Sequence, residues 1–281
     1  MSRRALRRAG PVALACAAAA LAGCGGHAQR VLRSEPSNQV ARQAGIGAVD
    51  RTTVRSVRHR DVVRCAAAVR RVGTASASLA AVGRRPLAAY AEPRHTRVVA
   101  RFGRRDVNGY PIVFAVLAER TGRACRASWY RVRLPTGPTI ANGSTGWIDA
   151  RAVRVFRVDA RIVVDLRRRR LHAYRAGREV LDVPVAVGAP GTPTPTGTFF
   201  VDERFLLSSA DGPFGPAALG ISARSNVLTD WVEGGPVALH GTDEPQLIGT
   251  AASHGCVRLR NDAMRRLFAL ASAGTPVVIR S

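Results

Sequence analysis

The sequence predicts a mainly β protein, made of a small β domain, a second β domain and one short helix near the C-terminus. Short apolar runs separated by Gly, Pro and Asn turn signals fill most of residues 72–201. One later segment has a helical period, and the longest uncharged apolar run, Ala9 to Cys24, is shorter than the about 20 residues of a membrane helix. Apolar residues make up 46% of the chain and charged residues 22%, which disfavours a disordered, collagen-like or coiled-coil chain.

The N-terminal segment has the order of an export signal. Four Arg residues precede the apolar run, and Leu21-Ala22-Gly23-Cys24 closes it with small residues. This tetrapeptide resembles the lipobox of bacterial lipoproteins, which implies a signal peptide over residues 1–23 and a lipid on Cys24. An ordinary signal peptide cut nearby is the alternative. Residues 24–60 are polar and predict a flexible tether, so we expect a lipid-anchored domain at the extracytoplasmic face of the cell membrane.

The chain is strongly basic, with 43 basic and 19 acidic residues and a formal charge of +24. Every basic residue is Arg. Such a balance usually suggests nucleic-acid binding, because Arg neutralises phosphates. Export argues against that partner, and the Arg residues are not interleaved with aromatic side chains that stack on bases. We therefore predict a general attraction to an anionic cell envelope and no nucleic-acid partner.

The cysteines divide by position once export is accepted. Cys16 leaves with the signal peptide and Cys24 is the lipid site, so Cys65, Cys125 and Cys256 remain in the folded part. An oxidising compartment pairs thiols and leaves an odd one over. We predict a disulfide between Cys65 and Cys125, which would close a loop of about 60 residues and contribute about 4 kcal/mol. Cys256 is then the free thiol.

Residues 61–156 contain the strand signals of the small β domain. Their turn signals include Asn108-Gly109 and Asn142-Gly143, and the runs between them are residues 97–100, 112–117, 129–134 and 146–148. The Trp-Tyr-Arg-Val-Arg-Leu strand, the second Asn-Gly turn and Gly146-Trp147-Ile148 resemble the end of a bacterial SH3-type domain. That resemblance implies an SH3-like barrel, which either binds cell-wall peptides or only positions its neighbour.

Residues 157–281 contain the second set of strand signals and the helix. The runs at residues 161–166, 171–174, 183–188 and 198–201 have hairpin spacing, and a loop stiffened by two prolines, residues 191–197, lies between the last two. A strand ends at residues 238–242, and another begins at residues 253–259. A helical period then places four side chains on one face: Met264, Leu267, Phe268 and Ala271. We expect residues 276–280 to form a closing strand.

The segment around Cys256 carries the candidate chemistry. A cysteine is a useful nucleophile only as a thiolate, so a neighbouring imidazole must take its proton or stabilise the anion. His254 would share a face with Cys256 if the segment were extended, and His240 ends a separate strand, so spacing does not decide which imidazole is the base. Gly255 permits a backbone conformation that aims amides at an oxyanion. The alternatives are a buried structural cysteine and a zinc site, but the three candidate ligands lack a recognised finger spacing, so no metal is predicted.

Four separated motifs make the resemblance specific. They are residues 193–199, His240-Gly241-Thr242, Leu247-Ile248-Gly249 and Ser253-His254-Gly255-Cys256-Val257-Arg258-Leu259, and together they resemble the catalytic domain of L,D-transpeptidases (YkuD-type). The resemblance implies a β-sandwich domain acting on peptidoglycan stem peptides. It assigns Cys256 as the acyl-accepting nucleophile and His240 as the base, oriented by the carbonyl of Gly241. His254 would line the site, and the amides of Gly255 and Cys256 would hold the oxyanion.

The implied reaction is acyl transfer from a tetrapeptide stem, with release of D-Ala, to an amine of a neighbouring stem. It needs no cofactor, and β-lactams of the carbapenem type would acylate Cys256. Ser253 and Arg258 are the candidate substrate-binding residues; Arg258 either pairs with a stem carboxylate or forms a structural ion pair. Val257-Arg258 stands where some family members have Asn after the nucleophile. The alternatives are an L,D-carboxypeptidase and a non-catalytic envelope lipoprotein that binds wall peptides.

Overall fold

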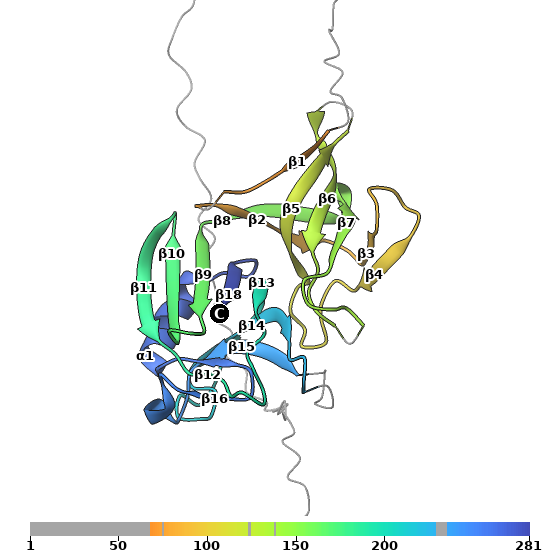
Figure 1. The fold of residues 1–281 in the computed structure, drawn as a ribbon. Coiled ribbons are helices and arrows are strands. Elements are labelled where there is room, and N and C mark those ends of the chain that lie inside the picture. Colours follow the sequence, from red (N-terminus) through yellow and green to blue (C-terminus); the bar gives the residue numbers. More distant parts are fainter. Residues whose placement is uncertain (1–67, 75, 123–124, 138, 229–234) are drawn as a thin grey trace, which may run out of the picture. The chain divides into compact units, whose positions relative to one another are not determined.

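Two large β-sheets account for most of the structure, which is a computed structural model (Figure 1). It describes residues 68–74, 76–122, 125–137, 139–228 and 235–281. In this part of the chain one α-helix accompanies the strands, so the predicted mainly β class with a short helix near the C-terminus is confirmed. The first sheet ends with β8 at Val158, and the second begins with β9 at Ala160.

The first sheet has eight strands in the order β4-β3-β7-β6-β5-β2-β8, with β1 also paired to β5. Its core contains the fully buried Phe114, Val132 and Ile148. The four predicted runs correspond to β4 to β7, whereas β2 and β3 were not predicted because their Ala-rich sequences have weak strand propensity. The bounds are β1 Val69–Arg71, β2 Ser78–Gly83, β3 Leu87–Tyr90, β4 Val98–Phe102, β5 Val113–Thr121, β6 Ala127–Arg133, β7 Thr145–Asp149 and β8 Val153–Val158.

The second sheet also has eight strands, in the order β11-β10-β9-β18-β13-β14-β15-β17. A separate parallel pair, β12 with β16, lies beside the last of them. The bounds are β9 Ala160–Asp165, β10 Arg170–Arg175, β11 Arg178–Pro184, β12 Val187–Gly188, β13 Gly197–Leu206, β14 Ala217–Arg224, β15 Pro236–His240, β16 Ala251–Ser253, β17 Val257–Arg258 and β18 Pro276–Arg280.

The helix α1, Asn261–Leu270, packs on the core of the second sheet. Met264, Leu267 and Ala271 are buried and Phe268 is partly buried, as the helical period predicted. Arg204 of β13 stacks 4.2 Å above the Phe268 ring and donates to the Phe268 carbonyl. The predicted closing strand is β18, which pairs in parallel with β9 and antiparallel with β13. Helix and closing strand therefore fix the end of the chain to the sheet that carries the candidate site.

Several predictions fall on residues that the structure does not describe. The signal peptide 1–23, Cys24, the tether 24–60 and Cys65 all lie outside the described residues. Cys125 is described and is disulfide-bonded. Among the described residues, no helix combines the length and the apolar character needed to cross a membrane.

Candidate active site

His240 ends β15, and Cys256 directly precedes β17, the strand that pairs with the end of β15. β15 and β17 run in parallel, with Leu239 opposite Val257 and His240 opposite Arg258. Leu239 and Val257 are fully buried in the core, and side chains alternate along a strand. His240 and Arg258 therefore project from the other face of the sheet. Cys256 immediately precedes β17, and its sulfur is hydrogen-bonded to the backbone of Ala238 in β15.

Cys256 stands in a tight turn between β16 and β17. Gly255 has a φ of 116°, a conformation that L side chains rarely adopt. The hydroxyl of Ser253 donates to the Cys256 carbonyl at 2.5 Å and accepts from the Gly255 N–H at 3.1 Å. Ser253 is 1% exposed, so its buried hydroxyl stabilises the turn through these two hydrogen bonds. The segment is not extended, and His254 is exposed while Cys256 is half-buried.

This turn changes three expectations about the site. His254 and Cys256 were expected to share a face only if the backbone between them were extended. Gly255 has a left-handed φ, so the segment is not extended and the two side chains do not follow that pattern. The N–H of Gly255 was expected to face an oxyanion, but it donates to the Ser253 hydroxyl. Ser253 was expected to bind substrate, but its hydroxyl is buried and engaged with the turn on both sides.

The proline-stiffened loop and the residues just before it hydrogen-bond the strand end that leads into the turn. The Ala189 N–H and the Thr192 hydroxyl both donate to the Ser253 carbonyl, at 2.8 and 3.1 Å. The Gly188 N–H in turn donates to the buried Thr194 hydroxyl at 2.8 Å. The loop therefore fixes the strand end from which the nucleophile turn starts.

His240 is held in one tautomer by its own neighbour. Its Nδ1 lies 2.6 Å from the Gly241 carbonyl oxygen, the contact that the resemblance implies. A carbonyl only accepts hydrogen bonds, so Nδ1 carries the proton and Nε2 keeps a lone pair. The ring is 3% exposed, and burial lowers the pKa of His240 to about 4. The imidazole is therefore neutral at pH 7 and able to accept a proton.

The thiol is neutral in the resting site as well. Cys256 is the free cysteine of the described residues, and burial raises the pKa of its thiol. The hydrogen bond with the Ala238 backbone and the charge of Arg258 oppose this rise. A neutral thiol beside a neutral imidazole indicates proton removal by a general base during attack, rather than a standing thiolate.

Arg258 already has an ion-pair partner in this structure. Its Nη1 lies 2.7 Å from the Glu244 Oε2, and its side chain is 18% exposed. Of the two predicted roles, the structural ion pair is therefore present. Its charge contributes to the lowered pKa of His240 and favours the thiolate of Cys256. Arg258 thus acts on the electrostatics of both candidate reacting groups.

Three residues near the site were not predicted from the sequence as site residues. The Phe214 ring packs edge-on against His240, with centroids 5.0 Å apart. Glu244 pairs with Arg258, and Asn261 hydrogen-bonds the Thr242 N–H. The position of Asn261, shortly after the nucleophile motif, is the signal that could have pointed to it. The other two lie in loops, where the sequence has no period to place them.

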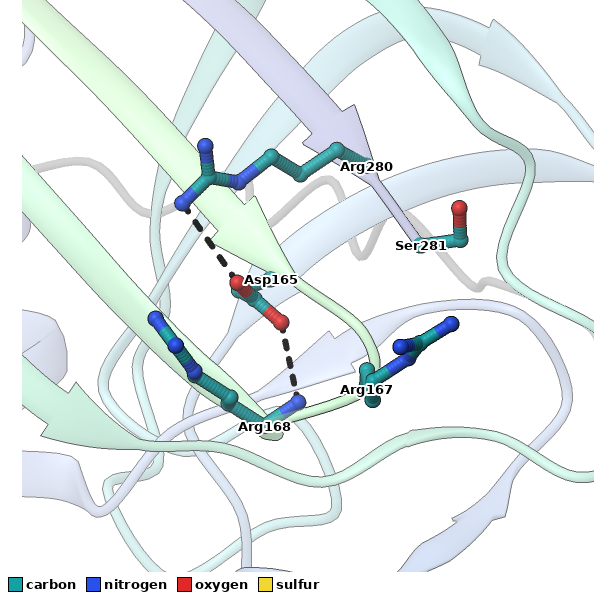
Figure 2. A pocket seen from close by; sticks show the side chains of 5 residues that line it. All are labelled: Asp165, Arg167, Arg168, Arg280 and Ser281. Atoms are coloured by element: carbon teal, nitrogen blue, oxygen red, sulfur yellow. Dashed lines mark hydrogen bonds and ion pairs between the residues drawn. The ribbon is translucent and has the colours of Figure 1, made fainter.

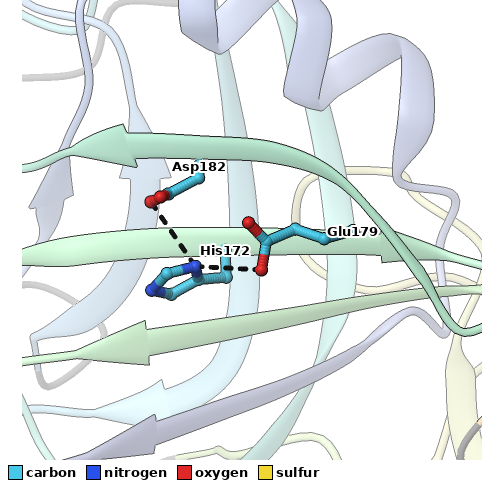
Figure 3. A group of neighbouring side chains, drawn as sticks. All are labelled: His172, Glu179 and Asp182. Carbon is cyan, nitrogen blue, oxygen red and sulfur yellow. Dashed lines mark ion pairs between the residues drawn. The ribbon is translucent and has the colours of Figure 1, made fainter.

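A possible metal-ligand group lies elsewhere in the second sheet (Figure 3). Within the described ranges, His172 of β10 and Glu179 and Asp182 of β11 are the group of three ligand residues whose atoms lie within 4.8 Å of one another. His172 Nδ1 is 3.3 Å from Glu179 and 3.4 Å from Asp182, while Arg170 Nε is 2.8 Å from the same Asp182 oxygen. His172 lies between the two partly exposed carboxylates, and the Arg170 guanidinium also pairs with Asp182. An ion-pair network therefore accounts for this cluster of ligand-type side chains.

A pocket of about 380 Å³ lies at the ends of β9 and β18 (Figure 2). Its central carboxylate, Asp165, accepts from the Arg168 N–H at 2.9 Å and pairs with Arg280 at 3.4 Å. These contacts lower the pKa of Asp165. The pocket is lined by Asp165, Arg167, Arg168, Arg280 and Ser281. None of these residues belongs to the site around Cys256, so the pocket adds nothing to the candidate chemistry.

Asp202 provides a test of the electrostatics of β13. A register shift between Val201 and Glu203 interrupts the pairing with β14, and Asp202 lies within it. Burial, followed by the charge of Glu203, raises the pKa of Asp202 to about 8. The unfolded group ionises near 3.8, so the folded state binds the extra proton between these values and loses stability as pH rises from about 4 to 8.

We expect Asp202→Asn to remove this pH dependence. Thermal unfolding followed by circular dichroism should give similar Tm values for the two proteins at pH 5. At pH 9 the variant should unfold at a clearly higher temperature, because the wild-type protein must by then ionise a buried carboxyl. Parallel Tm curves from pH 4 to 9 would contradict the raised pKa.

Sequence comparison identifies the second β region. Residues 159–279 match the family model of YkuD, the L,D-transpeptidase catalytic domain. A Bacillus licheniformis protein named as the L,D-transpeptidase YkuD is 35% identical over 119 residues, which are 42% of this chain and 64% of the relative. A Salmonella typhimurium protein named as the L,D-transpeptidase ErfK/SrfK is 31% identical over 153 residues, covering 49% of this chain and 50% of the relative.

The solved structures include an avibactam carbamoyl enzyme called Ldtfm. It is 28% identical, with a TM-score of 0.34, over 44% of this chain and 49% of that chain. The chain thus spans between half and two thirds of the length of the two named sequence relatives. The matched segment contains β9 to β18, α1 and both candidate reacting residues. Residues 159–279 are therefore similar to the L,D-transpeptidase catalytic domain, over a segment that makes up less than half of the chain.

Proposed function

We propose that this chain is a peptidoglycan L,D-transpeptidase in which Cys256 is the nucleophile and His240 the base. One observation carries the proposal: a free cysteine directly precedes β17, and β17 pairs with the end of β15, which presents a neutral imidazole with Nε2 available. The match of residues 159–279 to the catalytic domain supports the substrate class, which is a peptidoglycan stem peptide.

In the first step His240 takes the thiol proton on Nε2 while the Cys256 sulfur attacks a carbonyl of the stem. That carbonyl joins the L-centre of the diamino acid to the terminal D-Ala. The N–H of Cys256 is the amide proposed to hold the oxyanion, because the N–H of Gly255 is engaged by Ser253. The C–N bond then breaks, and His240 returns its proton to the departing D-Ala amine. A thioester on Cys256 remains.

In the second step an amine of a neighbouring stem attacks the thioester. His240 accepts one proton from this amine as the new amide forms, and returns it to the departing sulfur, which leaves as the thiol. Water in place of the amine gives L,D-carboxypeptidase activity by the same route. The side of the sheet that holds His240 also carries Arg258, whose charge would attract a stem carboxylate once its pairing with Glu244 loosens.

The remaining parts of the chain are assigned by sequence alone. We propose that Cys24 carries a lipid, that residues 24–60 form a tether, and that residues 61–156 are an SH3-like domain. These assignments place the enzyme at the outer face of the cell membrane. An intact mass spectrum of the protein extracted from membranes tests two of them together, since it reports the lipid mass and whether Cys65 and Cys125 are oxidised. An unlipidated mature mass would contradict the anchor.

The activity is tested by incubating the purified protein with a tetrapeptide stem. We expect release of free D-Ala, detected by mass spectrometry, and a cross-linked dimer when a second stem supplies an amine. Release of D-Ala without a dimer would support the carboxypeptidase, and binding of stem peptide without any release would support the non-catalytic lipoprotein.

A further inference from the structure

Asn261 follows the nucleophile segment in the chain and hydrogen-bonds the segment after His240 and the loop that contains Phe214. The chain runs from Cys256 through β17, and directly after this strand the Leu259 N–H donates to the His240 carbonyl at 2.8 Å. Two residues later, Asn261 Oδ1 accepts from the Thr242 N–H at 2.8 Å. The Asn261 side chain therefore adds a second hydrogen bond between the segment that follows Cys256 and the segment that contains His240.

The Thr242 N–H belongs to the same peptide group as the Gly241 carbonyl. At one end of this group the carbonyl oxygen accepts from His240 Nδ1 at 2.6 Å, and at the other end the N–H donates to Asn261. Hydrogen bonds in series polarise one another, so an acceptor on the N–H makes the carbonyl a better acceptor for the imidazole proton. Asn261 is thus connected to His240 through a single peptide unit.

Close packing fixes the Asn261 amide in this position. A Cβ on Gly215 or on Gly241 would meet Asn261 Oδ1 at 2.3 Å, so the side chain sits tightly against both glycines. Its Nδ2 donates to the Ala210 carbonyl at 3.0 Å. Residues 210–215 include Phe214, whose ring packs against His240. The same amide thereby anchors the start of the segment that carries Phe214.

We propose that Asn261 is a positioning residue of the Cys256–His240 pair, which acts through the Gly241–Thr242 peptide to fix the orientation and basicity of His240. The inference rests on the proposed function in taking these two residues as the reacting pair. The charged groups that face His240 are Arg258 and Asp243, and neither is contacted by Asn261 in the contacts described. Replacing Asn261 with alanine therefore removes the hydrogen bond to the Gly241–Thr242 peptide without removing a charge near His240.

The test measures the rate of alkylation of Cys256 by iodoacetamide from pH 5 to 10, with the modified peptide quantified by mass spectrometry. This readout needs no peptidoglycan substrate, so it holds even if D-Ala release fails. Asn261→Ala removes the acceptor, weakens the hold on the Nδ1 proton and so disfavours proton transfer from sulfur. We expect its alkylation midpoint to rise by about one pH unit, and its rate at pH 7 to fall about tenfold.

Two further variants separate positioning from a general loss of structure. Ser222→Ala removes another buried oxygen that accepts a backbone N–H in the same domain, from Phe200 at 3.1 Å, and should keep the wild-type midpoint. Asn261→Asp keeps an acceptor for the Thr242 N–H and loses the donor to Ala210, and should restore the rate to within about threefold. The proposal is overturned if Asn261→Ala keeps the wild-type midpoint, if Ser222→Ala shifts it equally, or if Asn261→Asp behaves like Asn261→Ala.

Discussion

Replacing Cys256 with alanine is expected to abolish both D-Ala release and the covalent adduct with a carbapenem. The sulfur is the atom that forms the thioester, and no other group in the described turn is a nucleophile that could replace it, because the Ser253 hydroxyl is buried and donates to the Cys256 carbonyl. We expect D-Ala release to fall by about 10³-fold or more, in line with the loss of a covalent nucleophile. The measurements are D-Ala quantification and intact mass after incubation with a carbapenem.

The fold should survive this change, because Cys256 is half-buried and outside the main hydrophobic cluster. Thermal unfolding of the variant therefore provides the control for folding. A carbapenem mass shift on folded Cys256→Ala would place the acylated atom elsewhere and would contradict the assignment. Unchanged D-Ala release would contradict it as well.

Strand positions in both sheets were predictable where β-branched and aromatic residues cluster between turn signals. The run at residues 112–117 became β5, and that at residues 161–166 became β9. The Ala-rich β2 and β3 were missed because alanine carries little strand propensity, and their pairing depends on neighbours remote in sequence. The end of the chain was predicted well, since the helical period of α1 and the apolar run of β18 are local signals.

The candidate site was predictable in composition and less so in geometry. The sequence indicated Cys256 and His240, because a cysteine and two histidines stand in motifs typical of one family. It did not indicate that Gly255 would turn the chain and leave His254 exposed, since φ at a glycine is not determined by the residue type. It also missed Asn261, whose partner Thr242 is 19 residues away. A hydrogen bond between segments this far apart in the sequence depends on the completed sheet, which brings the start of α1 and the loop after β15 together.

The loop behind the nucleophile turn leads to the second large expected effect, that of Gly188→Ala. A Cβ at Gly188 would lie 2.3 Å from the Thr192 carbonyl oxygen and 2.4 Å from the Thr194 N. Both are backbone atoms, so the loop must move to relieve the clash. Movement of Thr192 would break its hydrogen bond to the Ser253 carbonyl and shift the strand end from which the Cys256 turn starts. We expect a loss of about 2–4 kcal/mol in the free energy of unfolding.

The same displacement should lower the acylation rate of Cys256 by about 10²-fold, because a misplacement of about 1 Å at a reacting group costs this much. Gly191→Ala is the matched control. It lies three residues further on, between β12 and β13, where a Cβ meets nothing within 4 Å and φ is outside the left-handed region. We expect it to leave both rate and stability near the wild type, or to raise stability slightly. Denaturant unfolding and the time course of the carbapenem adduct measure the two effects. If the two variants behave alike, the loop does not position the nucleophile turn.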